Sequence, residues 1–354
     1  MKILIVGNGG REHAIAWKLS HSSQVQQIFC TPGNGGTVTQ AKCQNIVIPV
    51  TDFPALKQLI NDQNISLVVV GPEAPLALGI TDYLQQPNLK IFGPTKAGAI
   101  LEASKSWAKQ FMAEANIPTA KSATFTRAET AKEYITEIPI VIKADGLSAG
   151  KGVIQQQVLE PTLTNLQKRG INYQGVIYAG LMISPTGEPK VLEFNCRFGD
   201  PETQPLLSLL ETPLEELLLA CCEKRLAQLP PINWKQGVSV CVVLASGGYP
   251  GAYEKSKIIS GIEKAQATGA TIFHAGTKFQ AQNLITDGGR VLGVTAVGTN
   301  FTEAKAKAYT AVDYIQFEGM YYRRDIGSRV SDDSYIATFL VNSRIESKDN
   351  FNFY

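Results

Sequence analysis

The stretch VLEFNCRFGDPETQ, residues 191–204, carries chemically active side chains at alternate positions. Side chains alternate between the two faces of a strand, so Glu193, Asn195 and Arg197 would share one face while the apolar residues between them face the core. Carboxylate and amide oxygens suit Mg²⁺, and the guanidinium fork suits a carboxylate or a phosphate. We therefore predict a metal- and anion-binding face; the alternative is an edge strand whose polar face is solvated.

The residues after this strand predict how it ends. Gly199 permits a turn, Asp200 is a typical helix N-cap, Pro201 fits the first helical position and Glu202 fits the first turn. We expect a helix over ETQPLLSLLE to follow.

A second chemically active stretch is KADGLSAGKGV. Lys143 ends an apolar strand, and Lys151 lies in a glycine-rich loop. Two cations and flexible backbone amides can hold an oligophosphate. The loop is not a Walker A motif, because Gly152 stands where a Ser or Thr would bind Mg²⁺. Metal ligands must therefore come from elsewhere, and the polar strand face supplies candidates. The alternative is a glycine hairpin without a ligand.

Strands and helices alternate over the first hundred residues. We expect strands at residues 2–6, 27–30, 46–48, 67–70 and 90–92, with helices such as 53–61 between them. This alternation predicts a doubly wound parallel sheet. Ligands of such sheets bind at the carboxyl ends of the strands.

Two of the loops at these strand ends are candidate binding sites. The loop Gly7–Gly10 opens onto a helix N-terminus, which favours a phosphate; the alternative is a tight turn. The dinucleotide fingerprint G-x-G-x-x-G is incomplete, because Glu12 occupies its third glycine position. Glu73 lies between two prolines, either to bind sugar hydroxyls or as part of a rigid loop.

The elements that follow predict two further parts of the chain. We expect one helix over 99–116, strands at 122–125 and 138–143, a helix over 158–169 and a hairpin ending in the strand described first. After a Leu229-Pro230-Pro231 linker, strands at 239–245, 271–274 and 291–297 and a helix capped by Thr302 predict an α+β domain.

This last part also contains a single histidine and a pair of adjacent arginines. His274 has no obvious partner, so we expect a packed histidine. Arg323 and Arg324 are either an anion site or a solvated pair.

Composition excludes several classes of protein. The chain has 354 residues, with 33 Lys and Arg against 31 Asp and Glu, which favours neither a nucleic-acid nor a membrane partner. No apolar segment is long enough to span a bilayer. The 6 cysteines show no CxxC spacing, so we expect reduced thiols, no zinc site and a cytoplasmic location.

Several of these motifs together resemble one known family. They are GNGGREHA, GPEAPLALGI, FGPTKAGAILEASK, IKADGLSAGKGV, YAGLMI, LEFNCRFGDPETQ, ASGGYPG, FHAGT, GGRVLGVTAVG and YYRRDIG. In this order, from Met1 to about Val330, they resemble phosphoribosylamine–glycine ligase (glycinamide ribonucleotide synthetase), an ATP-grasp family of purine synthesis. The resemblance implies that ATP phosphorylates the glycine carboxylate, and that 5-phosphoribosylamine then attacks the glycyl phosphate.

The resemblance also implies a role for each candidate residue. Lys105, Lys143 and Lys151 would bind ATP. Glu193 and Asn195 would bind Mg²⁺, or Mn²⁺ in its place. Arg197 and Lys151 would be catalytic, with Arg197 holding either the glycine carboxylate or the transferring phosphoryl group. The phosphoribosylamine site would be formed by Gly9, Gly10, Glu73, Arg290 and Arg323.

The chain departs from the family pattern near residues 155–160. Family members carry several tens of residues there, which form the lid of the ATP site, whereas here Ile154 is followed within a few residues by the next helix. We expect an α/β fold: an N-terminal doubly wound parallel sheet (1–98), an incomplete ATP-grasp core (99–229), a C-terminal α+β domain (230–330) and a tail from Ser331. Without the lid we expect severely reduced ligase activity.

Two other functions remain open from the sequence. One is a non-catalytic protein that binds a phosphoribosyl group or a nucleotide. The other is a dinucleotide-dependent oxidoreductase, which the missing third glycine disfavours. We expect a monomer, with self-association through any apolar surface that the missing lid exposes.

Overall fold

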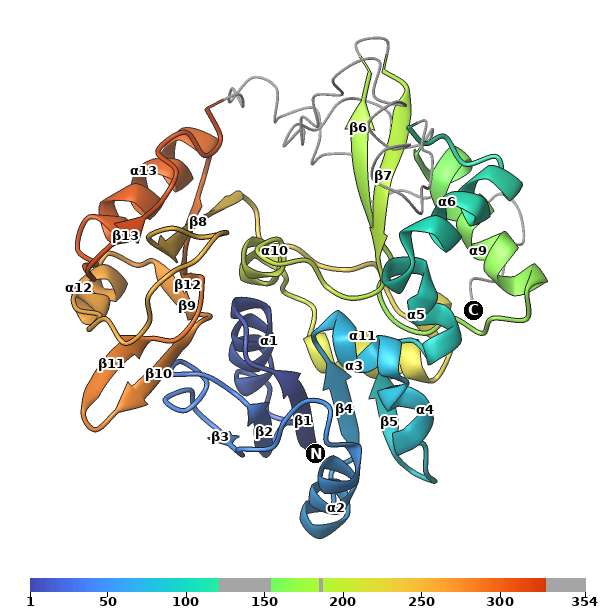
Figure 1. Ribbon diagram of the computed structural model, residues 1–354, viewed down its shortest axis with the longest axis horizontal. Helices are drawn as coiled ribbons and strands as arrows, with labels where there is room; N and C mark the ends of the chain where they lie inside the picture. Colours follow the sequence, from blue (N-terminus) through green and yellow to red (C-terminus); the bar gives the residue numbers. More distant parts are fainter. Residues whose placement is uncertain (121–153, 185–186, 329–354) are drawn as a thin grey trace.

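The computed structural model describes residues 1–120, 154–184 and 187–328. The expected strands at 122–125 and 138–143, which include Lys143, lie outside the described residues, as do Lys151 and the tail from Ser331. In the described part, Figure 1 shows the N-terminal sheet below, the C-terminal sheet at the left and a long hairpin at the right.

The N-terminal sheet has five parallel strands in the order β3-β2-β1-β4-β5. They are β1 (Lys2–Gly7), β2 (Gln27–Pro32), β3 (Cys43–Asn45), β4 (Leu67–Val70) and β5 (Lys90–Phe92). Ile3 and Ile5 of β1 pack with α1 (Gly10–Ser20), whereas Leu4 and Val6 pack on the other face with α2 (Phe53–Gln63). The predicted doubly wound sheet is confirmed.

The third strand was predicted wrongly at residues 46–48, because it ends at Asn45. The N–H of Ile46 still bonds to the carbonyl of Cys30 at 2.9 Å, but the N–H of Ile48 bonds back to the carbonyl of Ile46 at 2.9 Å. This local turn takes the apolar residues out of the sheet. An apolar run alone does not show whether its backbone bonds to a neighbouring strand or to itself.

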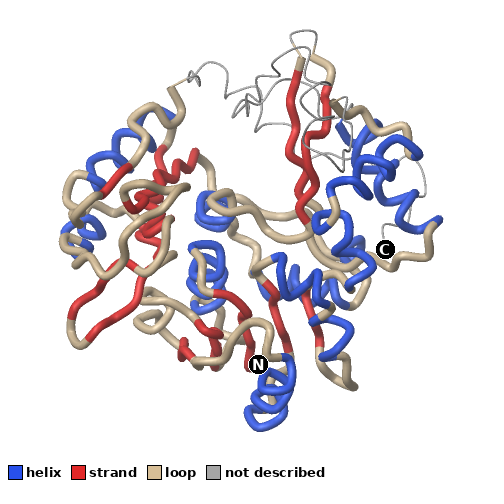
Figure 2. The backbone as a smooth tube through the Cα atoms, viewed as in Figure 1, coloured by secondary structure: helices blue, strands red, loops and turns tan. Residues whose placement is uncertain are grey.

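The helix expected over 99–116 is two helices, α5 (Lys96–Ala103) and α6 (Lys105–Glu114). Ser104 separates them because its backbone is extended and its hydroxyl accepts the N–H of Trp107 at 3.2 Å, as an N-cap. The helix expected over 158–169 begins with a π-helical turn, η1 (Gln155–Leu159), and continues as α9 (Glu160–Lys168). Figure 2 shows α5, α6 and α9 grouped beside the hairpin.

That hairpin pairs β6 (Tyr178–Ile183) with β7 (Pro189–Asn195) in antiparallel register. Its apolar side packs on the neighbouring helices, where Phe111, Leu166, Val191 and Phe194 share one core. The predicted strand bearing Glu193 and Asn195 is therefore confirmed.

The helix after β7 begins later than expected. It is α10 (Thr203–Leu209), and Asp200 does not cap it. The Asp200 carboxylate is instead engaged by Gln204 and Arg290. Helix α10 lies between α1 and the C-terminal strands β8 (Val238–Ser246) and β12 (Arg290–Gly298), at the centre of Figure 1. Three further elements complete this region: α3 (Glu73–Leu78), α4 (Ile80–Leu84) and α11 (Leu214–Cys222).

The C-terminal domain is a four-stranded sheet in the order β13-β8-β12-β9, whose neighbouring strands are antiparallel. Its other elements are β9 (Thr271–His274), β13 (Met320–Tyr321), α12 (Ile262–Ala267) and α13 (Phe301–Val312). Asn300, and not Thr302, caps α13, because the Asn300 side chain accepts the N–H of Glu303 at 2.9 Å. The hairpin of β10 (Thr277–Gln280) and β11 (Asn283–Thr286) was not predicted.

Two buried histidines join the N-terminal and C-terminal sheets. The backbone N–H of His274, at the end of β9, donates to Nδ1 of His13 on α1 at 2.8 Å. Asn34 adds a second link, because its amide donates to the carbonyls of Asn8 at 2.9 Å and His274 at 2.8 Å. The expectation of a packed His274 is confirmed, but His13 is its partner. The six cysteines are free, and no helix among the described residues is long and apolar enough to span a membrane.

The buried histidines predict a loss of stability in mild acid. Burial, and then His274, lowers the pKa of His13 well below its ordinary value, and burial lowers the pKa of His274 to about 4. Below pH ~6.5 the unfolded chain binds protons that the folded chain excludes, so stability is full above that pH and falls below it. Urea unfolding should show a loss of about 1 kcal/mol per histidine at pH 5.5 relative to pH 7.5.

The variant His274→Gln should remove about half of this loss. The matched control is His21→Gln, because His21 is exposed. Equal pH dependence in the two variants would contradict the assignment to the buried pair.

Candidate active site

The carboxyl ends of β1 and β4 meet over one buried carboxylate, that of Glu12. Glu12 is 1% exposed. One oxygen accepts the N–H of Gly9 at 2.6 Å, and the other accepts Nε–H of Arg11 at 2.5 Å. A Cβ on Gly71 would lie 1.9 Å from a Glu12 oxygen, and a Cβ on Gly7 would lie 2.5 Å from its side chain. The glycines of these loops therefore leave room for Glu12.

This arrangement argues against a dinucleotide site. The side chain that replaces the third fingerprint glycine fills the space over Gly7 and Gly71. It also brings a buried carboxylate to the helix N-terminus where a pyrophosphate would bind. The glycine loop instead forms a compact turn at the N-terminus of α1.

Arg11 is a buried cation next to Glu12, and the sequence analysis did not single it out. It is 6% exposed, and its Nη1 donates to the carbonyl of Phe198 at 3.2 Å. Burial lowers the pKa of the Arg11 guanidinium, but Glu12, Asp200 and Glu73 raise it, and the pKa ends above its ordinary value. The motif GNGGREHA places Arg11 next to a helix N-terminus, and this was the sequence feature that could have identified it as a site residue.

Asp200 brings Arg290 to the glycine loop. The Asp200 carboxylate accepts Nε2–H of Gln204 at 2.9 Å and pairs with Nη2 of Arg290 at 3.3 Å. Nη1 of Arg290 also donates to the carbonyl of Asp200 at 2.6 Å. A Cβ built on Gly9 would lie 3.4 Å from Oδ2 of Asp200. The structure thus brings the predicted Gly9, Gly10 and Arg290 together and adds Asp200.

Arg197 lies just beyond the end of β7, between two carboxylates. Its Nη2 pairs with Glu102 at 2.9 Å, and its Nε lies 3.7 Å from an oxygen of Glu73, too far for a hydrogen bond. That buried Nε has no hydrogen-bond partner. Glu73 and Arg197 were predicted separately and meet in the structure, whereas Glu102 was not predicted. The guanidinium is thus held at Nη2 by Glu102 and at Nη1 by the carbonyl of Phe198, and only its buried Nε lacks a partner.

The metal donors that the sequence proposed are oxygen atoms on β7. Glu193 is exposed and Asn195 is buried on the same strand. Among the described residues, no group of three or more His, Cys, Asp or Glu side chains could hold a metal by itself. One carboxylate and one amide oxygen fit a hard cation that takes most of its ligands from phosphates and water. The donor set therefore fits a metal that arrives with a nucleotide.

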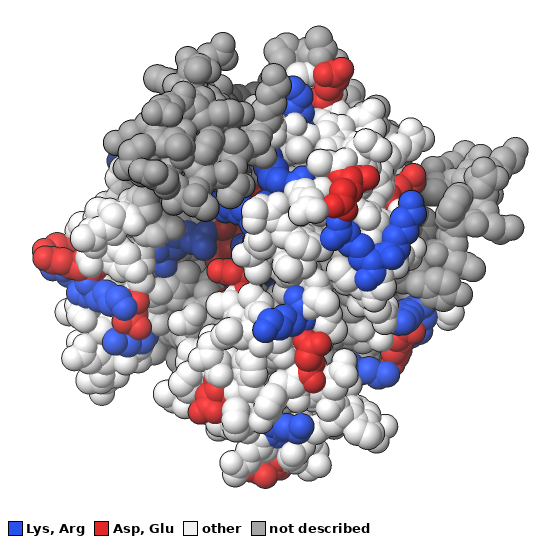
Figure 3. Space-filling model, turned by 45° about the vertical axis from the view of Figure 1, so that its right-hand side comes forward, with Lys and Arg blue, Asp and Glu red and all other residues white. Residues whose placement is uncertain are grey.

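Two other predicted residues are exposed on the surface. Lys105 is exposed at the first turn of α6. Arg323 is exposed and paired with Asp325, through Nε at 2.9 Å and Nη2 at 2.6 Å, so its charge is already compensated. Figure 3 shows basic and acidic side chains interspersed on the face it displays.

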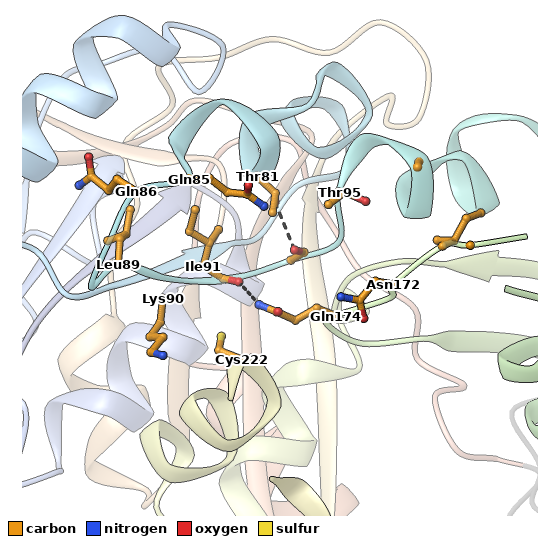
Figure 4. Close-up of a pocket in the computed structure, with 14 residues that line it drawn as sticks. Thr81, Gln85, Gln86, Leu89, Lys90, Ile91, Thr95, Asn172, Gln174 and Cys222 are labelled. Atoms are coloured by element: carbon orange, nitrogen blue, oxygen red, sulfur yellow. Dashed lines mark hydrogen bonds between the residues drawn. The ribbon is translucent and has the colours of Figure 1, made fainter. Parts of the chain in front are cut away.

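A separate hollow of about 680 Å³ lies beside β5, the loop at residues 170–174 and α11. Figure 4 shows Gln174 within it, and Nε2 of Gln174 donates to the carbonyl of Ile91 at 2.5 Å. None of the predicted site residues lines this hollow. The charged cluster at the strand ends is therefore the candidate active site.

Comparisons with known proteins show the family of this chain. Sequence models of phosphoribosylglycinamide synthetase match residues 1–102 (N domain), 103–156 and 154–203 (ATP-grasp domain) and 239–329 (C domain). The phosphoribosylamine–glycine ligase of Nostoc sp. is 50% identical over 94% of this chain and 100% of the relative. That of Synechocystis sp. is 44% identical over 93% of this chain and 100% of the relative.

The chain belongs to the phosphoribosylamine–glycine ligase family. A crystal structure of this ligase from Thermotoga maritima superposes with a TM-score of 0.70 at 27% identity, over 92% of this chain and 100% of that one. The family is one of ATP-dependent ligases with the ATP-grasp fold, and the ATP-grasp ligases use a divalent metal. The predicted family and fold class are confirmed.

Family members contain residues that this chain lacks. The alignment with the Nostoc ligase spans 424 positions, more than the 354 residues of the chain. The match to the family's ATP-grasp domain is split into two segments that meet at residues 154–156. The split falls at the start of η1, next to the place where the sequence departs from the family pattern.

The close packing of Glu12 predicts that Gly71→Ala destabilises the fold. Because the new Cβ would overlap a buried carboxylate oxygen, we expect a loss of about 2 kcal/mol or more in urea unfolding. The control is Gly170→Asn. Gly170 has a positive φ of 71° and nothing within 4 Å of an added Cβ, so Asn should cost under about 1 kcal/mol. Equal losses would show that Glu12 does not limit the space at Gly71.

Proposed function

We propose that this chain catalyses the ATP-dependent ligation of glycine to 5-phosphoribosylamine, with low turnover because the lid of its ATP site is absent. One observation carries the assignment: Arg11 and Arg197 both donate to the carbonyl of Phe198, each at 3.2 Å. This shared carbonyl brings the glycine-loop cluster and the end of β7 into direct contact. A phosphoribosyl site and a phosphoryl-transfer site would therefore adjoin, as a two-substrate ligation requires.

The proposed reaction has two steps. In the first, the terminal phosphoryl group of ATP moves to a glycine carboxylate oxygen, giving ADP and glycyl phosphate. In the second, the amine nitrogen of phosphoribosylamine attacks the glycyl carbonyl, phosphate leaves with the bonding electrons, and the nitrogen loses a proton. Arg197, just beyond the end of β7, would hold the glycine carboxylate or the transferring phosphoryl group.

The remaining residues would hold the substrates. Gly9 and Gly10, with Arg290 beside them, would form the part of the site that binds the phosphoribosyl group, and Arg290 would contact its phosphate. Glu73 would accept hydrogen bonds from its sugar hydroxyls, and Arg323 would close the site from the C-terminal domain. Lys105, Lys143 and Lys151 would bind the phosphates of ATP.

Magnesium is the proposed metal, and Mn²⁺ has the same preference for oxygen ligands. Glu193 and Asn195 would hold it through their side-chain oxygens. The ion would neutralise charge on the phosphates during transfer.

The residues missing near 154–156 would account for low turnover. We propose that they form the lid, because the two segments of the ATP-grasp match meet there. Without a lid, water reaches the phosphates, weakens the charge interactions and hydrolyses the acyl phosphate.

Turnover can be measured as phosphate release that depends on both glycine and phosphoribosylamine. We expect a rate about 100-fold or more below that of the Nostoc ligase. Inserting the corresponding Nostoc segment after Ile154 should raise the rate, whereas a Gly-Ser insertion of equal length should not. A rate equal to the Nostoc ligase in the unmodified chain would contradict the proposed effect of the missing lid.

Binding of the phosphoribosyl group can be tested without turnover. Titration calorimetry with ribose 5-phosphate should detect binding to the unmodified chain, and Arg290→Gln should weaken it about tenfold because a charge-assisted contact is lost. The control is Arg225→Gln, since Arg225 pairs with Glu223 after α11, outside the cluster. Absence of ribose 5-phosphate binding would contradict the assignment of the glycine loop to the phosphoribosyl site.

A further inference from the structure

We propose that Glu102 is a positioning residue of the ligase site, which sets the orientation of Arg197 and holds the backbone where β7 ends. The inference deepens the proposed function, since Arg197 is assigned there to bind substrate. Glu102 comes from α5 in the motif FGPTKAGAILEASK, and it was not among the residues predicted from the sequence.

The contacts of Glu102 all go to the two residues that follow Asn195. Oε2 accepts the backbone N–H of Cys196 at 2.8 Å and the thiol of Cys196 at 3.1 Å. Oε1 pairs with Nη2 of Arg197 at 2.9 Å. One carboxylate thus fixes a main-chain amide, a buried thiol and a guanidinium at the point where the strand leaves the hairpin. These are charge-assisted contacts, which are shorter and stronger than neutral ones.

The location of this carboxylate argues against a role in helix stability. Glu102 lies in the last turn of α5, where the helix dipole disfavours a negative charge. Its side chain is also only 12% exposed, so solvent does not compensate that cost. The ion pair and the two hydrogen bonds offset it, and all of them go to the two residues that follow β7, the strand with the proposed metal ligands.

The Cys196 thiol is a second donor to this carboxylate, because its Sγ lies 3.1 Å from Oε2 of Glu102. The guanidinium is fixed at Nη2 by Glu102 and at Nη1 by the Phe198 carbonyl. Its Nε is buried without a hydrogen-bond partner, 3.7 Å from an oxygen of Glu73.

The test is a double-mutant cycle on ligand binding. Glu102→Gln keeps the volume and can still accept the Cys196 amide, but it loses the charge that holds Arg197. Titrations with glycine and with Mg²⁺–ATP should show about tenfold weaker binding of at least one ligand. In an Arg197→Ala background, Glu102→Gln should change that affinity less than about twofold, because the residue through which it acts is gone.

The matched control is Glu114→Gln. Glu114 also lies near the C-terminal end of a helix and pairs with an arginine, Arg169, but on the outer side of α6. Its removal should leave both affinities unchanged. An equal loss from Glu102→Gln in the presence and absence of Arg197, or an equal loss from Glu114→Gln, would overturn the proposal.

A readout without ligand separates this inference from the proposed function. Hydrogen exchange of the Cys196 amide should accelerate at least about tenfold in Glu102→Ala and stay unchanged in Glu114→Gln. If the unmodified chain binds neither ligand, the proposed function fails, and the exchange result alone decides whether Glu102 holds this turn. Unchanged exchange in Glu102→Ala would refute the positioning role even if ligands bind.

Discussion

The buried ion pair of Arg11 and Glu12 is the interaction on which the geometry of the candidate active site depends. Glu12 occupies the space that the glycines at the ends of β1 and β4 leave open, and Arg11 reaches from it to the Phe198 carbonyl. A buried charge without its partner is costly, so neither side chain can move alone. The pair therefore fixes the distance between the N-terminal sheet and the end of β7, where the two proposed half-sites meet.

The same principle extends across the candidate site. Arg11 pairs with Glu12, Arg197 with Glu102, and Arg290 with Asp200. Arg197 and Arg290 are each held by a carboxylate from another segment, whereas Arg11 pairs with its neighbour on α1, so these charges are placed before any ligand binds. Such preorganised charges cost little reorganisation when charge develops in a reaction. Each pair also lowers the net positive charge that an incoming anion meets.

The split in the family match lies away from the contacts that join the two sheets. Helix α10 packs against α1, β8 and β12, and the buried pair of His13 and His274 joins the two sheets. In Figure 1 these elements lie at the left and centre, whereas α9, which follows the split, lies at the right. The charged cluster can thus persist without the missing residues, whereas we propose that their absence lets water reach the phosphates of ATP.

The sequence by itself determined the order of the elements, the doubly wound sheet, the strand bearing Glu193 and Asn195, and the family, because periodicity and motifs are local properties of the chain. The sequence analysis misplaced β3 because a local turn at Ile48 was not foreseen, and it joined α5 to α6 because the cap at Ser104 was missed. It assigned Asp200 to a helix cap, whereas Asp200 bonds to Gln204 and pairs with the distant Arg290. Only the tertiary structure paired Glu102 with Arg197, Asp200 with Arg290 and His13 with His274. These partners lie about a hundred or more residues apart, and which charges meet depends on how the sheets pack, which no local pattern encodes.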